Sequence, residues 1–184
     1  MAADKPGIKE LFVLLDSATS ELLKLISLLS EKELNTIPFE DSWTAAQLTS
    51  HVTKSNKAIL QALNMEGMAA ERNAGERVEE LKTTFLDLST KFKSPEFILP
   101  TLDVYQKDML VRSFEKSIGQ LKEGAAKVNL SEMIIIPAFG EITKLELLHF
   151  VLYHTQRHLY QFKNIFKVIH NNSGFIDGTD ITHN

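Results

Sequence analysis

His154 and His158 are the residues of this sequence whose types and spacing point most directly to chemistry. They lie in the segment LLHFVLYHTQRHLYQFKNI (147–165), which contains three of the six histidines of the chain. Residues four apart on a helix project from the same face, one turn apart. Two imidazoles placed in this way can converge on one divalent metal ion. The spacing alone leaves two interpretations open: one side of a metal site, or two half-buried histidines that are hydrogen-bonded to their neighbours.

Two nearby residues narrow the chemistry of this pair. The residue after His154 is Thr155, so the pattern is not the His-Glu-x-x-His of zinc proteases, in which the glutamate is the general base. His149 lies five residues before His154, and at about 100° per residue the helix turns it roughly 140° away. We therefore expect His149 to take no part in the site.

A third histidine, His51, lies on a second helical stripe. The residues of this stripe are spaced by three or four and comprise Thr44, Leu48, His51, Ser55, Ile59 and Ala62. Three inward-facing histidines cannot cheaply be protonated or left unpaired in an apolar core. One shared ion would satisfy all three, and three histidine ligands leave coordination positions open, as in catalytic zinc sites.

The elements that must position these histidines are helical almost throughout. Apolar stripes of helical period predict four long helices, at about 9–30, 44–63, 104–127 and 143–170, and one shorter helix at about 76–91. Thr44-x-x-Gln47 and Thr143-x-x-Glu146 fit capping boxes at two helix starts. We expect an all-α fold, an antiparallel up-down four-helix bundle with one additional short helix and at most two short strands. The bundle is expected to span residues 1–170 and a flexible tail residues 171–184.

Composition limits the classes of function. The 184 residues suffice for one domain, and the 20 Lys and Arg are scattered among 24 Asp and Glu, for a formal net charge of −4. This balance counts against a nucleic-acid or membrane partner. The chain has no cysteine, and its N-terminal segment lacks the apolar core of a signal peptide. We expect a cytoplasmic protein.

Five further residues near the histidines are assigned less specific roles. Trp43 is expected to be a packing anchor at a helix entry, and Arg157 to form a salt bridge near the bundle end. We expect Gln161 to line the core rather than to bind His158. The remaining two, Tyr153 and Tyr160, are expected to point away from the histidine stripe, toward a bundle or partner interface.

The two histidine segments together resemble the DinB superfamily, with its DinB/YfiT-like metal-dependent enzymes. The resemblance covers the chain from the first helix to about Ile169, and it is most specific in WTAAQLTSH (43–51) and ELLHFVLYHTQRHLYQ (146–161). Members are four-helix bundles, unrelated to the lesion-bypass polymerase that shares the name. In that family one histidine of the second helix and two of the last bind a divalent ion, commonly zinc or nickel. By position these are His51, His154 and His158.

The resemblance implies a metal-dependent enzyme that acts on a small-molecule substrate. Either a hydrolase or a transferase of a low-molecular-weight thiol is implied, with metal-bound water or thiol as the nucleophile. The sequence indicates no catalytic residue beyond the metal ligands. The alternative is a non-catalytic metal-binding or stress-related binding module, with a site that braces the bundle or is vestigial. An open polar pocket above the histidines would favour the enzyme, and a closed apolar one would favour bracing. The resemblance also implies a homodimer.

Overall fold

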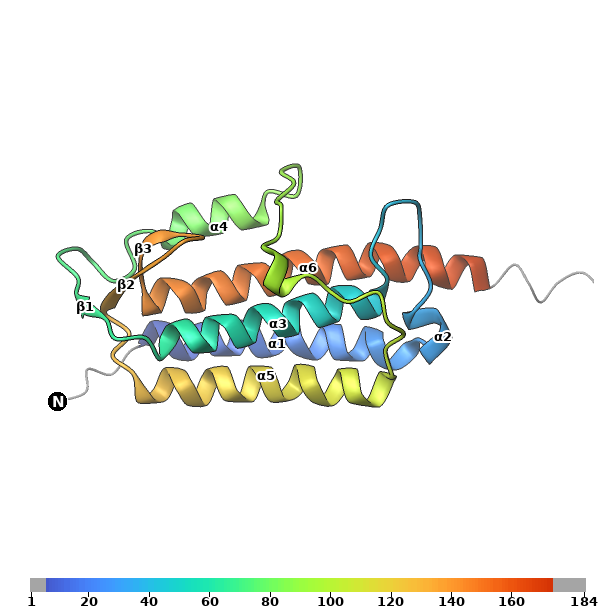
Figure 1. The fold of residues 1–184 in the computed structure, drawn as a ribbon, viewed down its shortest axis with the longest axis horizontal. Helices are drawn as coiled ribbons and strands as arrows, with labels where there is room; N and C mark the ends of the chain where they lie inside the picture. Colours follow the sequence, from blue (N-terminus) through green and yellow to red (C-terminus); the bar gives the residue numbers. More distant parts are fainter. Residues whose placement is uncertain (1–5, 174–184) are drawn as a thin grey trace, which may run out of the picture.

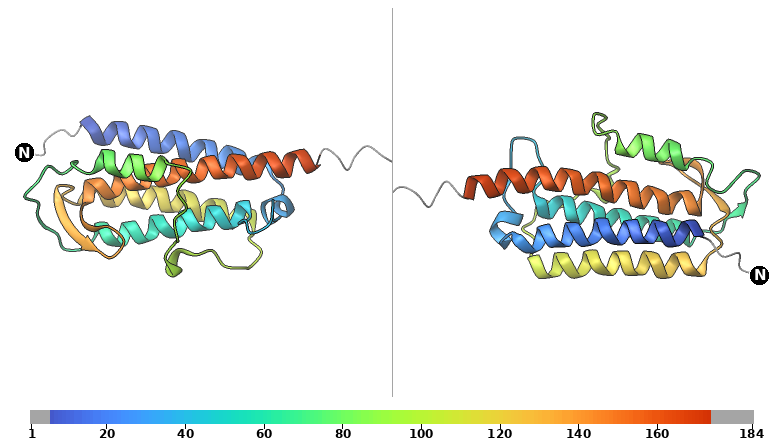
Figure 2. Two further views of the ribbon diagram at one scale, coloured as in Figure 1. Left: turned by 90° about the horizontal axis from the view of Figure 1, so that it is seen from above. Right: turned by 180° about the vertical axis from the view of Figure 1, so that it is seen from behind.

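Four long helices form the body of the molecule, which is a computed structural model that describes residues 6–173. They are α1 (Pro6–Leu28), α3 (Ala45–Leu63), α5 (Lys107–Lys127) and α6 (Lys144–Ser173), and they lie side by side along the long axis (Figure 1). Two further views show the same bundle from above and from behind (Figure 2). The expected four-helix bundle is confirmed. Residues 171–173 still belong to α6, and the rest of the expected tail lies outside the described residues.

The four long helices do not simply alternate in direction along the chain. α1 and α6 run one way, while α3 and α5 run the other way (Figure 1). The parallel course of α3 and α5 also follows from their contacts, because Asn56 bonds to Ser117 while Leu60 lies beside Gly124. A parallel pair needs a long return connection, and residues 64–106 supply it by crossing the outside of the bundle.

Two short helical elements lie within that connection, and a third precedes α3. α4 (Val78–Leu86) packs on α6, η1 (Glu96–Ile98) packs on α3, and α2 (Glu31–Leu34) follows α1. α4 is the expected additional helix, but it ends five residues before the predicted end at residue 91. Asp87 accepts hydrogen bonds from the backbone of Ser89 and from the hydroxyls of Ser89 and Thr90. Such local side-chain bonds compete with continuation of the helix.

A small antiparallel sheet closes one end of the bundle. β1 (Met68–Ala69), β2 (Glu132–Ile136) and β3 (Gly140–Thr143) are ordered β1-β2-β3, one strand more than the expected maximum of two. Met133 pairs with Thr143, and Gly140 has a φ of +65°, which favours glycine in the hairpin turn. The strand β3 leads directly into α6, so the hairpin fixes where the last helix begins.

Both predicted capping boxes are present. Thr44 Oγ1 accepts from the Gln47 backbone at 3.1 Å, and Gln47 Oε1 accepts from the Thr44 backbone at 3.0 Å. Thr143 and Glu146 make the same reciprocal pair at 3.1 and 3.0 Å. These boxes set the starts of α3 and α6, and therefore the heights at which their histidines lie along the bundle.

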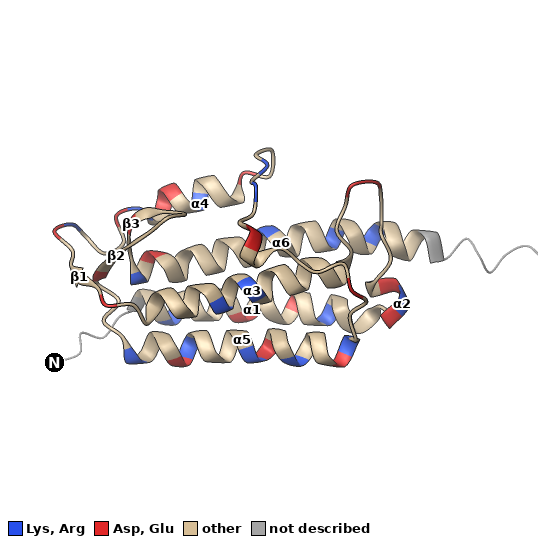
Figure 3. Cartoon of the chain, in the orientation of Figure 1, with Lys and Arg blue, Asp and Glu red and all other residues tan. Residues whose placement is uncertain are grey.

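The core of the bundle is mainly apolar, and the surface of the bundle carries both acidic and basic residues. Among the largest fully buried side chains are Leu22, Phe114, Leu121 and Phe162, which come from α1, α5 and α6. Acidic and basic residues are both scattered over the surface of the bundle, with neither gathered on one helix alone (Figure 3). Within residues 6–173, none of the helices combines the length and the hydrophobicity that a membrane span requires.

Candidate metal centre

His51, His154 and His158 come together in the interior between α3 and α6. Nε2 of His154 lies 3.3 Å from Nε2 of His51 and 3.0 Å from Nε2 of His158. The three side chains are buried, with exposed fractions of 1%, 6% and 7%. Among the described residues, these three form the only histidine and carboxylate cluster that could hold a metal ion, with candidate ligand atoms within 4.8 Å of one another.

The distances between these nitrogens fit one divalent ion. Two ligands at about 2.0–2.1 Å from a tetrahedral ion are separated by roughly 3.3 Å. The two measured Nε2 separations, 3.3 and 3.0 Å, are close to that value. The ligand atoms of the third pair, His51 and His158, lie within 4.8 Å of each other, so the three ligands already surround one point.

Two of the three imidazoles are held in one tautomer. His51 Nδ1 lies 3.0 Å from the carbonyl oxygen of Ile98, and His158 Nδ1 lies 2.7 Å from Gln161 Oε1. A carbonyl oxygen accepts only, so each Nδ1 carries the proton and donates it. The lone pair of each ring is then on Nε2, directed at the centre of the cluster. The prediction that Gln161 merely lines the core is wrong.

His154 shows that the cluster is incomplete without a further group. Its Nδ1 is buried and has no hydrogen-bond partner among the described residues. If the proton of His154 is on Nε2, this single N–H has to donate to the Nε2 atoms of both His51 and His158. The lone pair on His154 Nδ1 then has no donor. If the proton is on Nδ1, three lone pairs face one another at about 3 Å, which is unfavourable. A cation between the three Nε2 atoms would relieve that repulsion, so the donor set fits a metal ion.

The surroundings keep the imidazoles neutral, which is the form that binds metals. Burial, together with the charge of His51, lowers the pKa of His158 to about 3, although the bond to Gln161 opposes the shift. Burial also lowers the pKa of His154 well below its usual value, with smaller contributions from His158 and His51. For His51 burial again lowers the pKa, although the bond to Ile98 opposes the shift. Near neutral pH, protons compete weakly for these nitrogens.

Aromatic side chains surround the histidines. The ring centroid of Trp43 lies 4.9 Å from that of His51, and Phe150 lies 5.0 Å from His154. Phe85 of α4 meets Phe150 edge-to-face at 4.8 Å. Trp43 thus packs at the entry of α3, as predicted, and it does so against a histidine of the cluster. These rings exclude water from two sides of the site.

A segment that we call the crossing segment (residues 87–101) runs over α6 and α3 beside the histidines (Figures 1 and 2). On α3, His51 donates to Ile98 O, Lys54 to Leu99 O at 2.6 Å and Gln47 to Thr101 O at 3.2 Å. One of the anchors of this segment is therefore a histidine of the cluster.

Arg157 anchors the other end of the crossing segment. Its guanidinium donates to three backbone carbonyls, those of Phe85, Asp87 and Thr90. It also lies 4.9 Å from the ring centroid of Phe92. The salt bridge expected for Arg157 is absent among the described residues. The physical reason is that Arg157 is 7% exposed and faces backbone oxygens, which satisfy its donors.

The other residues singled out from the sequence lie outside the cluster. His149 does not join it, as predicted, and contacts Tyr153, whose hydroxyl lies 3.4 Å from His149 Nδ1. Tyr153 is only 7% exposed, so it is no surface residue, whereas Tyr160 is 49% exposed. Of the two roles expected for Tyr153, a bundle or a partner interface, the burial agrees with the bundle, because α4 packs on α6.

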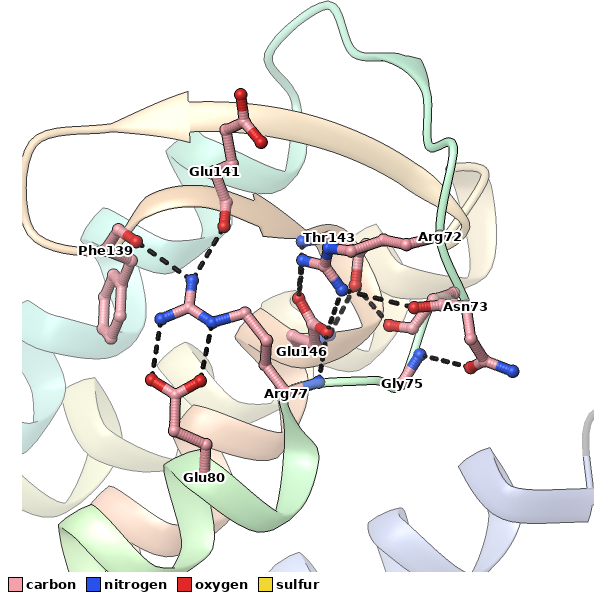
Figure 4. A network of polar contacts seen from close by, with 10 residues as sticks. Arg72, Asn73, Gly75, Arg77, Glu80, Phe139, Glu141, Thr143 and Glu146 are labelled. Carbon is pink, nitrogen blue, oxygen red and sulfur yellow. Dashed lines mark hydrogen bonds and ion pairs between the residues drawn. The ribbon is translucent and has the colours of Figure 1, made fainter.

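Sequence reasoning missed a second polar network, which holds α6 in place (Figure 4). Glu146 is fully buried, and its carboxylate accepts hydrogen bonds from both terminal nitrogens of Arg72, at 2.6 and 2.7 Å. It also accepts from the backbone of Arg77 at 2.8 Å, and Arg77 bonds in turn to Glu80 and to the carbonyls of the β2–β3 hairpin. Burial raises the pKa of Glu146, but the bonds from Arg72, Thr143 and Arg77 outweigh it and leave the pKa below the usual value. The capping box was the only sequence signal for this network.

Two surface cavities lie away from the histidines. One, of about 540 Å³, is lined by residues of α1 and α5, including Leu23 and Arg112. The other, of about 310 Å³, lies near β1 and is lined by Arg72 and Asn129 among others. Neither includes a histidine of the cluster, and the three histidines are enclosed by aromatic rings and the crossing segment.

The fold and the cluster together define a class: a four-helix bundle with three converging histidines, one from α3 and two from α6. The chain belongs to the DinB superfamily, whose family model matches residues 14–162. It is 24% identical over 144 residues to YuaE, an uncharacterized protein of Bacillus subtilis (strain 168), covering 74% of this chain and 85% of YuaE.

A solved crystal structure supports the fold. The structure is that of TT2238, a four-helix bundle protein, and it matches with a TM-score of 0.56 at 18% identity. The match covers 85% of this chain and 98% of TT2238. At this level of identity the likeness concerns the fold alone.

Proposed function

We propose that the protein binds one divalent metal ion through the Nε2 atoms of His51, His154 and His158, and that it is a metal-dependent enzyme. The observation that carries the proposal is the convergence of three buried Nε2 atoms, two of them already in the tautomer that presents a lone pair. Membership of the DinB superfamily supports the same conclusion. Zinc or nickel is the proposed ion, since both bind neutral imidazole well.

Three protein ligands leave room for a substrate group at the ion. The bound ion would supply Lewis acidity and lower the pKa of a water or thiol that it binds. We therefore propose either a hydrolase or a transferase that joins a low-molecular-weight thiol to an electrophile. Besides the histidines themselves, the side chains whose charge lowers the pKa values of the cluster are Lys54 and Arg157. Both are cations and would favour an anionic nucleophile.

Catalysis would require the crossing segment to move. The histidines are buried, and the segment is held by hydrogen bonds from Gln47, His51, Lys54 and Arg157. In the proposed enzyme, partial release of residues 93–101 would open the face of the site beside His51. Trp43 and Phe150 would stay in place and keep bulk water away from the nucleophile.

The enclosure of the site also favours a second candidate function. A metal ion in a closed, aromatic-lined site could brace α3 against α6 without turnover. Such a protein would be a non-catalytic metal-binding module. The two candidates differ in one observable: only the enzyme admits a small molecule to the ion.

The test begins with the metal content of purified protein, measured by mass spectrometry of the elements. We expect one equivalent of a divalent metal in the wild type and much less in His51→Ala. Metal-loaded and metal-free protein are then screened for thiol conjugation and for ester and amide hydrolysis. Metal-dependent turnover that His51→Ala abolishes supports the enzyme. Full metal occupancy without turnover or exchange of a small ligand supports bracing, and absence of metal binding removes both.

A homodimer through helix faces and a cytoplasmic location stay predictions. Of the two tyrosines expected at a bundle or partner interface, Tyr160 is the exposed one, with 49% exposure on α6. Light scattering at micromolar concentration should give twice the monomer mass of 20.8 kDa if the dimer forms. Tyr160→Glu should then shift the mass toward the monomer, because it places a charge in the interface.

A further inference from the structure

We infer that Gln161 is a positioning residue of the metal site, which fixes the tautomer and the ring orientation of His158. The inference rests on the proposed function, because it assigns a role beside the proposed ion. Gln161 lies three residues after His158 on α6, so the two side chains share one face of the helix. Its Oε1 lies 2.7 Å from His158 Nδ1, on the side of the ring away from the cluster.

The three histidines are supported in three different ways. His51 donates to a backbone carbonyl, that of Ile98. His154 has no partner at Nδ1 among the described residues and is held by its two neighbours at Nε2. Only His158 has a side chain as the partner of its Nδ1. Substitution can therefore remove the support of His158 without disturbing the backbone.

The chemical consequence concerns metal affinity. A hydrogen bond from Nδ1–H to an oxygen leaves the lone pair on Nε2 and makes the imidazole a stronger base and ligand. Without the acceptor, His158 can turn or move its proton to Nε2, where it would point at His154. Loss of such an outer hydrogen-bond partner typically weakens metal binding about 10–100-fold.

The experiment compares three substitutions on α6. Gln161→Met keeps the length of the side chain but removes the acceptor, and Gln161→Glu keeps an acceptor that cannot donate. Gln156→Met is the matched control, since Gln156 is turned roughly 160° away from His158 on the same helix. The affinity for Zn²⁺ is measured by competition with a chromophoric chelator. The visible absorption spectrum with Co²⁺ reports the coordination geometry.

We expect Gln161→Met to bind Zn²⁺ about 10–100-fold more weakly and to show an altered Co²⁺ spectrum. Gln161→Glu should bind at least as tightly as the wild type, and Gln156→Met should be unchanged. Rescue by glutamate is the decisive outcome, because a carboxylate can restore the bond only if Nδ1 is the donor. If the Met variant does not fold, Gln161→Asn, which is too short to reach Nδ1, takes its place with the same expectation.

Three results would overturn the inference. The first is wild-type affinity and spectrum in Gln161→Met, and the second is equal weakening in Gln161→Glu. The third is equal weakening in Gln156→Met, which would show a general effect of altering α6. If the wild type itself binds no divalent metal, the proposed function fails as well. That outcome is distinct, because it appears before any variant is compared.

Discussion

The Nε2 atoms of His51 and His154 lie 3.3 Å apart although 103 residues separate them in the sequence. The contact joins the first half of α3 to the first half of α6, and His158 completes the triangle from one turn further along α6. Two capping boxes fix the starts of these helices, so the meeting of the rings is a property of the bundle as a whole.

Removal of His154 should affect metal binding far more than removal of His149. His154 lies between the other two ligands, whereas His149 contacts Tyr153 outside the cluster. We expect His154→Ala to lose more than the roughly 10–100-fold in affinity that is typical of an outer partner, and His149→Ala to bind as the wild type does. Calorimetric titration with Zn²⁺ measures both. Equal losses in the two variants would exclude the three-histidine site.

The stability of the metal-free protein should fall as the pH decreases below about 6.5. In the unfolded chain the histidines have pKa values near 6.5, whereas burial lowers the pKa of His158 to about 3 and lowers those of His51 and His154. Below pH 6.5 the unfolded chain therefore binds protons that the folded protein does not. Each histidine can reduce the free energy of unfolding by up to about 1.4 kcal/mol per pH unit in that range.

Urea unfolding at pH values from 7.5 to about 4.5 tests this linkage. His158→Gln should make the dependence on pH shallower, because one buried neutral histidine is removed. The same lowered pKa values imply that Zn²⁺ binding persists below pH 6.5, lower than the ordinary histidine pKa would suggest. A pH-independent unfolding free energy between 6.5 and 4.5 would contradict the burial of neutral imidazoles.

Glu146→Gln should destabilise the fold by about 2–3 kcal/mol. The buried carboxylate accepts from Arg72, from the Arg77 backbone and from the Thr143 backbone, and an amide nitrogen cannot accept from any of these donors. Glu80→Gln is the control, since the Glu80 side chain is 58% exposed and exposed pairs contribute little, less than about 1 kcal/mol. Urea denaturation of both variants gives the comparison, and similar losses would show that the network at the start of α6 is not specific.

Lys54→Met should speed the release of the metal ion to a chelator. Lys54 Nζ donates to Leu99 O and so holds the crossing segment next to the bond between His51 and Ile98. Lys57→Met is the control, since Lys57 lies one turn further along α3 and bonds to Ser113 of α5 instead. Metal release to excess EDTA, followed by absorbance of the Co²⁺ form, measures the rate. Equal rates in Lys54→Met and the wild type would show that residues 93–101 do not control access.

Much of the fold and the choice of histidines could be predicted from the sequence because both are local patterns. Helical spacing placed His154 and His158 on one inward face and turned His149 away. Thr44-x-x-Gln47 marked the start of α3, where the cap is now seen at 3.1 Å. These signals are encoded within one or two turns and need no knowledge of the partner helix.

What could not be predicted depends on contacts between distant segments. Arg157 was expected to pair with an acid, but a buried guanidinium bonds to whichever oxygens the tertiary fold presents, here backbone carbonyls. Tyr153 was expected at a bundle or partner interface, and only the packing of α4 on α6 shows that it is a bundle residue. The spacing of Gln161 from His158 is visible in the sequence. Only the orientation of the His158 ring in the structure shows that Oε1 of Gln161 contacts Nδ1 of His158.

The anchoring of the crossing segment through its main chain has a consequence for sequence change. The anchoring side chains bond to carbonyl oxygens of this segment, and in the case of Arg157 also to that of Phe85 in the last turn of α4. Every amino acid offers a carbonyl oxygen. The anchors are Gln47, His51, Lys54 and Arg157. Most side chains of residues 87–101 can therefore be exchanged without loss of these anchors. A library that varies exposed positions such as Phe97, which is 71% exposed, would change the protein surface near the histidines while the bundle stays intact.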